Sequence, residues 1–100
     1  MAYFAMRLRA PRVTFPFDAT AEEVALMQSH GAYWHEKAQA GIAIVVGPVM
    51  DPAGPFGLAV VEVEDEAGAR ALGHADPVVA AEVGFSYEVM PMPSLILRRS

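Results

Sequence analysis

The feature that most constrains the fold is a long helical segment with a sequence signal at each end. Thr20 and Glu23 have the spacing of a capping box, in which each side chain accepts a hydrogen bond from the other residue's backbone N–H. Gly41 is the residue type that commonly ends a helix. The sequence therefore predicts a helix over 21–40. The apolar run Ile42–Val46 follows at once and predicts a strand that is covered on both sides.

The sequence also predicts secondary-structure elements before and after this helix and strand. They are a strand over 2–9, a Gly-Pro turn at 47–48 opening a loop to 57, a strand over 58–64, a helix over 66–73 capped by Asp65, a short helical turn between Pro77 and Gly84, and a strand over 85–90. Residues 95–97 could add an edge strand or one exchanged with a partner. The order is that of a split βαβ plan. We therefore expect one α+β domain over residues 1–100, ferredoxin-like, with an antiparallel sheet and its helices on one face.

Helical spacing predicts which side chains of the two longer helices face the sheet. In the first helix they are Val24, Met27, Gly31, Trp34 and Ala38, and in the second Ala67, Ala71 and Leu72. Successive helical residues are rotated by about 100°, so His30 and His35 lie on opposite borders of the first stripe. Periodicity therefore leaves the choice between the two histidines open.

Composition favours self-association and argues against two classes of partner. Apolar residues make up 54% of the chain, above the usual ~45–50%, and the net charge is −5. A small chain with surplus apolar surface commonly buries it against another subunit, so we expect a homodimer or a higher homo-oligomer, built on a dimeric α+β barrel. The acidic balance argues against nucleic acid, since Arg7, Arg9 and Arg12 form only a short basic cluster. No apolar run approaches the ~18 residues of a membrane span.

The chain contains no cysteine. This excludes disulfides, thiolate metal sites and a cysteine nucleophile. The N-terminal residues also lack the apolar core and cleavage site of a signal peptide. We expect a cytoplasmic protein.

His30 and Asp76 are the candidates for acid/base chemistry, although 46 positions separate them. A carboxylate beside an imidazole holds one tautomer and stabilises the charged ring, so the ring can take and return a proton. Each residue also has a structural explanation. A histidine at the border of an amphipathic helix is commonly half exposed, and an aspartate before Pro77 is a typical helix N-cap. The two roles of Asp76 are compatible, because its two oxygens can act separately.

Other kinds of site have weaker sequence support. His30, His74 and Asp76 could in principle hold a metal, but such proximity is common by chance, and we expect no metal and no cofactor. The loop over 52–57 lacks the lysine and the spacing of a phosphate-binding loop. Three methionines are expected to fill apolar gaps and not to bind copper: Met50, Met90 and Met92.

Several motifs, taken in order, resemble the YCII-related family of small dimeric proteins. They are His30, Tyr33, Gly41, Gly47-Pro48 and Asp76-Pro77. The resemblance extends from the first strand to Pro91 and favours His30 over His35, because His30 is the histidine eleven residues before Gly41. In that family an aromatic residue commonly follows Asp-Pro. Here the residue is Val78, which predicts a reshaped pocket.

The resemblance implies a ferredoxin-like dimer whose histidine and aspartate form the active-site pair. It also implies elimination or isomerisation of small ring compounds, dehydrochlorination included. We therefore expect a cofactor-free lyase or isomerase in which His30 is the general base and then the acid, and Asp76 orients it. Residues expected to form the small-molecule site are Tyr33, Trp34, Gly47 and Pro48. The alternative is a ligand-binding or sensing dimer without turnover.

Overall fold

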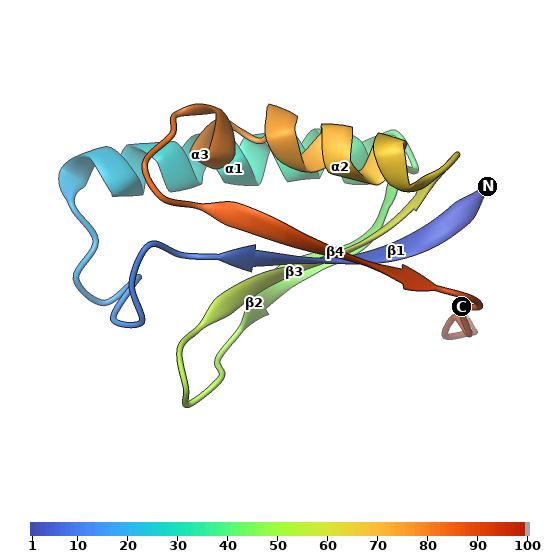
Figure 1. Cartoon of the computed structure of the whole chain (residues 1–100), viewed down its shortest axis with the longest axis horizontal. Helices are drawn as coiled ribbons and strands as arrows, with labels where there is room; N and C mark the ends of the chain where they lie inside the picture. The colour runs from blue at the N-terminus through green and yellow to red at the C-terminus, as the bar shows by residue number, and fades with distance from the viewer. Residues whose placement is uncertain (100) are drawn as a thin grey trace.

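A computed structural model describes residues 1–99 of the chain. They form an antiparallel sheet with the helices packed on one face (Figure 1). The strands are β1 (Ala2–Arg9), β2 (Ala43–Val49), β3 (Phe56–Val63) and β4 (Ser86–Met92), and the helices are α1 (Ala21–Gln39), α2 (Glu66–Ala75) and α3 (Pro77–Ala80). The four strands lie in the order β2-β3-β1-β4, and every neighbouring pair is antiparallel. This is the expected ferredoxin-like α+β arrangement.

Helix α1 begins and ends as predicted, to within one residue. The Thr20 hydroxyl accepts from the Glu23 backbone N–H at 3.1 Å, and a Glu23 carboxylate oxygen accepts from the Thr20 N–H at 2.9 Å. At the other end Gly41 has a φ of +79°, a left-handed conformation that glycine adopts without a steric penalty. The capping box and the glycine stop are both confirmed.

Strand β2 differs from its prediction in two ways. It is an edge strand that pairs with β3 alone, and Val45 is 55% exposed, so it is not covered on both sides within this chain. It also continues through Gly47 and Pro48, which pair with Leu58 and Gly57 where a turn was expected. An edge strand tolerates proline because the missing N–H falls on its unpaired side. The other edge strand, β4, also contains a proline, Pro91.

The buried side of α1 is rotated from the predicted stripe. Trp34 is buried, and Met27 is partly buried as expected, but Val24 is 49% exposed and Glu23 is buried in its place. Hydropathy misplaces the stripe because Glu23 is paired with Arg12, and a paired charge can be buried.

The buried side of α2 also differs from its prediction. Ala69 and Gly73 are buried and Leu72 is partly buried, whereas Ala67 and Ala71 are exposed. The reason is a close approach at Gly73, where an added Cβ would lie 3.0 Å from the ring of Tyr87. Helix α2 therefore packs against β4 through Gly73, which has no side chain to clash with Tyr87.

The remaining boundaries shift by a few residues. β3 begins at Phe56, two residues before its predicted start, and ends at Val63, one residue before its predicted end. β4 runs from Ser86 to Met92, whereas the prediction was 85–90. Within the described residues, 93–99 contain no strand, so residues 95–97 do not extend the sheet of their own chain. Proline at position 93 interrupts backbone pairing at this point.

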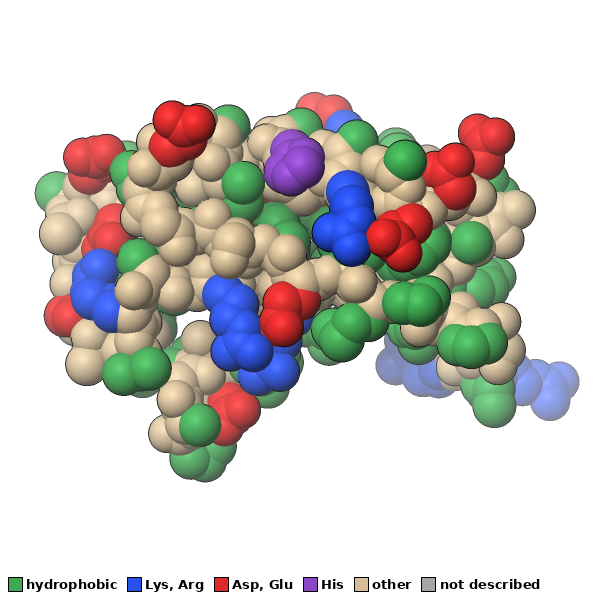
Figure 2. Space-filling model, in the orientation of Figure 1, with side chains coloured by type: hydrophobic (Ala, Val, Ile, Leu, Met, Phe, Trp, Pro, Cys, Tyr) green, Lys and Arg blue, Asp and Glu red, His purple; other side chains and the backbone are tan. Residues whose placement is uncertain are grey.

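Alternation along the strands gives the sheet two different faces. Phe4 and Met6 are buried beneath the helices, together with their neighbours in β3. The opposite face, which we call the open face, carries a row across all four strands: Val45, Val60, Ala5 and Met90. Figure 1 shows the three helices on one side of the sheet only. Figure 2 shows acidic side chains next to basic ones at several places on the face of the molecule in view, with hydrophobic side chains between those places.

Among the described residues, no helix is both long enough and apolar enough to cross a membrane.

Candidate functional site

Asp76 lies at the junction of α2 and α3 and is fully buried. Its Oδ1 atom accepts a hydrogen bond from the Val78 backbone N–H at 3.1 Å, so it caps α3. Pro77 occupies the first turn of that helix, where its missing N–H costs nothing. The predicted N-cap role of Asp76 is confirmed, and this role uses only one carboxylate oxygen.

The other oxygen of Asp76, Oδ2, contacts three side chains from two further elements. It lies 2.7 Å from Nδ1 of His30, and it accepts from Nε1 of Trp34 at 2.9 Å and from the hydroxyl of Tyr87 at 2.5 Å. The Trp34 N–H also reaches the Tyr87 oxygen at 2.9 Å. The predicted approach of His30 to Asp76 is confirmed, and α1, β4 and the α2–α3 junction meet at one oxygen atom.

The hydrogen bonds determine the charge state of this cluster. Burial alone raises the pKa of Asp76, but the hydrogen bonds from His30, Tyr87 and Trp34 outweigh it and hold that pKa below its usual value. Burial and the neighbouring Asp76 together raise the pKa of Tyr87 far above its usual value, so its hydroxyl stays protonated. An ionised carboxylate only accepts hydrogen bonds, so Nδ1 of His30 carries a proton. Nε2 is then the ring nitrogen left for a ligand.

A cleft of about 500 Å³ lies beside His30, between α1, the β2–β3 edge and the loop before α1. Its volume falls within the ~300–1,000 Å³ range of small-molecule sites. Its walls are almost entirely apolar. The residues that line it include Phe15, Met27, His30, Trp34, His35, Ala38, Ile44, Val46, Gly47, Pro48, Phe56, Phe85 and Tyr87.

The cleft includes three of the four residues predicted for the small-molecule site. Trp34, Gly47 and Pro48 line it, whereas Tyr33 is not among its lining residues. The Tyr33 hydroxyl donates to the Leu72 carbonyl at 2.7 Å, because the rotation of one residue along α1 turns this side chain toward α2. The structure therefore places Tyr33 in the packing between α1 and α2.

Two further predictions concern residues near the cleft. His35 also lines it, but of the two histidines it is His30 whose ring is hydrogen-bonded to Asp76, which agrees with the choice made from the resemblance. Val78 is fully buried and packs with Leu8 and Phe85 in the second core cluster, behind the cleft wall. Leu8 and Phe85 line the cleft, whereas Val78 does not.

Within residues 1–99, no group of three or more histidine, aspartate or glutamate side chains is arranged to hold a metal ion. His74, the third residue considered for such a site, is exposed near the end of α2.

Comparison with protein families agrees with this architecture. The family model of the YCII-related domain matches residues 1–93 of the 100-residue chain. The chain belongs to the YCII-related family. No match was found among curated proteins. The matched range contains all of the ordered motifs, and within the YCII-related domain His30 and Asp76 meet in space.

Tyr87 is the site residue of this YCII-related domain that the sequence alone did not reveal. Within β4, exposed Ser86 and Glu88 alternate with the partly buried Tyr87 and Val89, and this period of two could have placed Tyr87 on the helix face. Trp34 was expected only as a pocket wall, whereas its indole N–H also donates to Asp76. Neither donor can be assigned to Asp76 without knowing which elements pack together.

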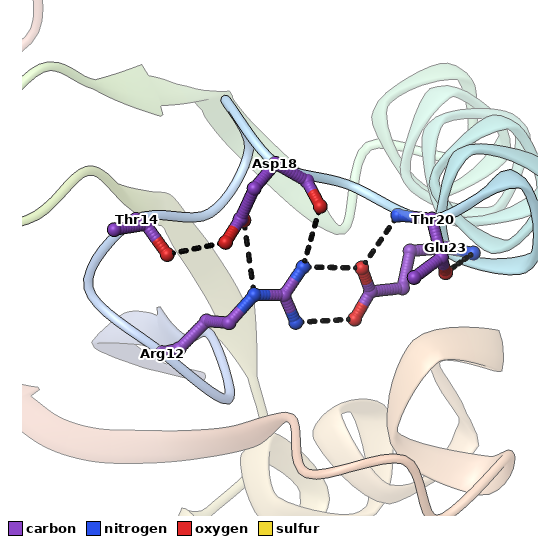
Figure 3. A network of polar contacts seen from close by, with 5 residues as sticks. All are labelled: Arg12, Thr14, Asp18, Thr20 and Glu23. Atoms are coloured by element: carbon purple, nitrogen blue, oxygen red, sulfur yellow. Dashed lines mark hydrogen bonds and ion pairs between the residues drawn. The ribbon is translucent and has the colours of Figure 1, made fainter.

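A second polar network fixes the loop that forms one end of the cleft (Figure 3). Arg12 donates to both carboxylate oxygens of Glu23, at 2.8 and 2.6 Å, and to the Asp18 side chain at 2.9 Å. Thr14 donates to the same Asp18 carboxylate at 2.6 Å. Because Glu23 belongs to α1, this network ties the loop, with the cleft residue Phe15, to the start of that helix.

Proposed function

We propose that this YCII-related protein is a cofactor-independent lyase or isomerase that acts on a small ring compound. The observation that carries the proposal is the hydrogen bond between His30 and the buried Asp76 at the wall of an apolar cleft. This bond fixes the proton on Nδ1 and leaves Nε2 to act as a base.

The proposed reaction begins when Nε2 of His30 removes a proton from a substrate carbon next to a carbonyl or a leaving group. The electron pair of the broken C–H bond then forms a double bond. In an isomerisation, the imidazolium returns the proton to another carbon. In an elimination, a leaving group such as chloride departs with its bonding electrons, and the imidazolium later loses its proton to water. Such a base typically contributes ~10²–10⁴ in rate.

Asp76 has a supporting role in this mechanism. Its pKa is held below the usual value, so it remains ionised while the imidazole gains a proton, and it stabilises the charge that develops on His30. Trp34, Gly47 and Pro48 line the cleft beside the base and would contact the ring of the substrate. Dehydrochlorination of ring compounds, implied by the family resemblance, is one reaction of this type.

The proposal is tested by proton exchange into candidate substrates. Lactones, hydroxyquinols and small hydroxy acids are incubated with the protein in D₂O and followed by proton NMR. We expect at least one compound to lose its acidic C–H signal or to form product. His30→Ala should slow this exchange by ~10²-fold or more, and Asp76→Asn should slow it as well. His35→Ala is the matched control, because His35 lines the same cleft without contacting Asp76. Equal exchange in the wild type and in His30→Ala would disprove the proposal.

A ligand-binding or sensing protein without turnover is the second candidate. It is favoured by the polar contacts of Asp76, which caps α3 with one oxygen and accepts from three side chains of the protein with the other, as a structural residue would. This function predicts compounds that raise the melting temperature of the wild type but not of His30→Ala, while none of their C–H protons exchanges. Stabilisation together with exchange favours the enzyme.

We also propose that the protein is a cytoplasmic homodimer that assembles through its open face. This face carries Val45 and Met90, which are 55% and 43% exposed, and a buried Nε atom of Arg7 that has no hydrogen-bond partner among the described residues. An obligate interface of this kind buries on the order of 2,000 Å² or more. Light scattering should give a dimer for the wild type and a monomer for Met90→Glu. Ala67→Glu, on an exposed position of α2, should stay dimeric. A wild-type monomer at micromolar concentration contradicts this arrangement.

A further inference from the structure

The polar and charged groups around the cleft are distributed in a way that bears on its ligand. None of the residues that line the cleft, within the described part of the chain, is a lysine, arginine, aspartate or glutamate. The side chains that offer polar atoms are His30, His35, Tyr87 and the indole of Trp34. Most proteins that bind a carboxylate or phosphate place a cation or a helix N-terminus against it, and this cleft has no such cation.

Two arginines lie behind the cleft walls, and carboxylates stand beside each of them. The Arg12 guanidinium lies 5.9 Å from the ring centre of Phe15 and is paired with Glu23 and Asp18. The Arg7 guanidinium lies 3.9 Å from the ring centre of Phe56, a second aromatic residue of the cleft.

Arg7 is flanked by Asp51 and Glu88, at 3.7 and 4.0 Å. In both cases an aromatic ring of the cleft is backed by a guanidinium whose charge is balanced by carboxylates. Neither arginine lines the cleft itself.

The nearest negative charge to the base is Asp76, 2.7 Å from the His30 ring. An anionic ligand at His30 would lose its hydration in an apolar cleft whose described lining has no lysine or arginine to replace it. A cationic ligand would also be desolvated without a partner, because Asp76 is fully buried and already accepts from three side chains on Oδ2. Only an uncharged ligand avoids both penalties.

We infer that the cleft selects uncharged, largely apolar ring compounds and excludes those that carry a carboxylate, a phosphate or an ammonium group. This inference rests on the proposed function, because it names the substrate class of the same site. The ligand makes its polar contact with Nε2 of His30 through a weakly acidic C–H or O–H, and its ring packs against the aromatic walls. Among the candidate substrates named above, the cleft therefore selects lactones and phenolic compounds over hydroxy acids.

The test uses three ligands with one ring system: 2-naphthol, 2-naphthoate and 2-naphthylmethylammonium, all at neutral pH. The chain has a single tryptophan, Trp34, which lines the cleft, so its indole N–H signal in proton–nitrogen NMR spectra reports binding at this site. Titrations should show 2-naphthol binding at least about tenfold more tightly than either charged compound, a difference of about 1.4 kcal/mol.

A cation placed in the cleft should reverse this selection. Ala38 is exposed and lines the cleft, so Ala38→Lys supplies a charge without disturbing the core, and it should bind 2-naphthoate at least about tenfold more tightly than the wild type does. Ala38→Gln controls for side-chain size. Ala67→Lys, exposed on α2 and outside the cleft lining, controls for net charge. Neither control should gain affinity for 2-naphthoate.

Several results would overturn the inference. They are a wild-type affinity for either charged compound equal to or above that for 2-naphthol, equal binding of 2-naphthoate by Ala38→Lys and Ala38→Gln, or no shift of the Trp34 signal with any of the three. The proposed function fails by a different result, the persistence of substrate proton exchange in His30→Ala. A cleft that binds 2-naphthol selectively but exchanges no proton would keep the inference and favour the ligand-binding function.

Discussion

Two buried carboxylates stand at the starts of two helices, and they are stabilised in different ways. Glu23, at the start of α1, is 8% exposed, and Asp76, at the start of α3, is fully buried. Glu23 accepts from one guanidinium on both of its oxygens and from the Thr20 backbone N–H. Asp76 accepts from a backbone N–H and from three side chains, none of which is a permanent cation.

The difference separates a structural contact from one that can take part in chemistry. Arg12 keeps its charge at any physiological pH, so the pair that it forms with Glu23 has no second state. Among the partners of Asp76, His30 is the imidazole, the side chain that proteins most often use to take up and release a proton, and its second ring nitrogen is outside the network. A carboxylate surrounded by neutral donors can therefore respond to a proton, whereas one paired with arginine cannot.

The largest effect should follow removal of the Asp76 carboxylate. Asp76→Ala takes the cap from α3 and leaves the donors of His30, Trp34 and Tyr87 unpaired in a buried position. We expect a loss of about 3–5 kcal/mol in the free energy of unfolding, measured by urea denaturation. Asp65→Ala removes only the exposed cap of α2 and should cost about 0.5–2 kcal/mol. Equal losses in the two variants would mean that Asp76 is a cap and nothing more.

A smaller effect should follow removal of one donor to Asp76. Tyr87→Phe deletes the hydroxyl that donates at 2.5 Å, and a hydrogen bond to a charged group contributes about 1.5–3 kcal/mol. The pKa of Asp76 should rise, because this bond is one of the contacts that lower it. Carbon-13 NMR of the Asp76 carboxyl group measures the shift. Tyr3→Phe, on the open face, is the control and should leave that titration unchanged. An unaltered Asp76 titration in Tyr87→Phe contradicts the role assigned to the hydroxyl.

The capping box of α1 should contribute less than the Asp76 cluster. Thr20→Ala removes the oxygen that accepts from the Glu23 N–H, a change that typically costs about 0.5–2 kcal/mol. Thr14→Ala, which deletes an exposed hydroxyl of the same network, should stay within about 0.5 kcal/mol of the wild type. Chemical denaturation of both variants makes the comparison. A larger loss from Thr14 than from Thr20 would place the strength of this network in the loop and not in the helix cap.

The smallest effect should be a change in the acid response. Arg12 lowers the pKa of Glu23 from 4.5 to about 2, so the stabilisation by Glu23 is complete above pH 4.5 and is lost as the pH falls toward 2. Glu23→Gln removes this titration, and its stability should fall less steeply than that of the wild type over the same pH window. Glu22→Gln carries the same charge change at an exposed neighbour and is the control. Thermal unfolding across this pH range measures the slopes, and parallel curves for wild type and Glu23→Gln would contradict the effect of Arg12.

Much of the fold follows from local signals in the sequence. Thr20, Glu23 and Gly41 define α1 through contacts between near neighbours, and the alternation of Phe4 and Met6 identifies the face of β1 that is buried. The failures come from contacts between distant residues. Glu23 is buried because Arg12 pairs with it, and Gly73 faces the core because Tyr87 lies against it.

The candidate site was only partly predicted, again because some of its contacts join residues that are distant in the sequence. His30 and Asp76 could be paired from the order of the motifs, and their contact is confirmed at 2.7 Å. Tyr87 completes the cluster from the last strand, and no local pattern joins that strand to Asp76. Tyr33, placed by sequence in the pocket, turned out to bond Leu72, since one step along a helix changes which neighbour a side chain meets.

The two prolines in the sheet limit how copies of this protein can aggregate. Pro48 lies in β2 and Pro91 in β4, the two edge strands, and the central strands β1 and β3 contain none. An edge strand normally offers a continuous ladder of N–H and C=O groups on which another chain can add a strand and begin a fibril. Each proline removes one donor from that ladder. The addition of further strands to β2 or β4 is therefore disfavoured. The prolines protect this apolar protein from aggregation at the two edges where strand addition would begin.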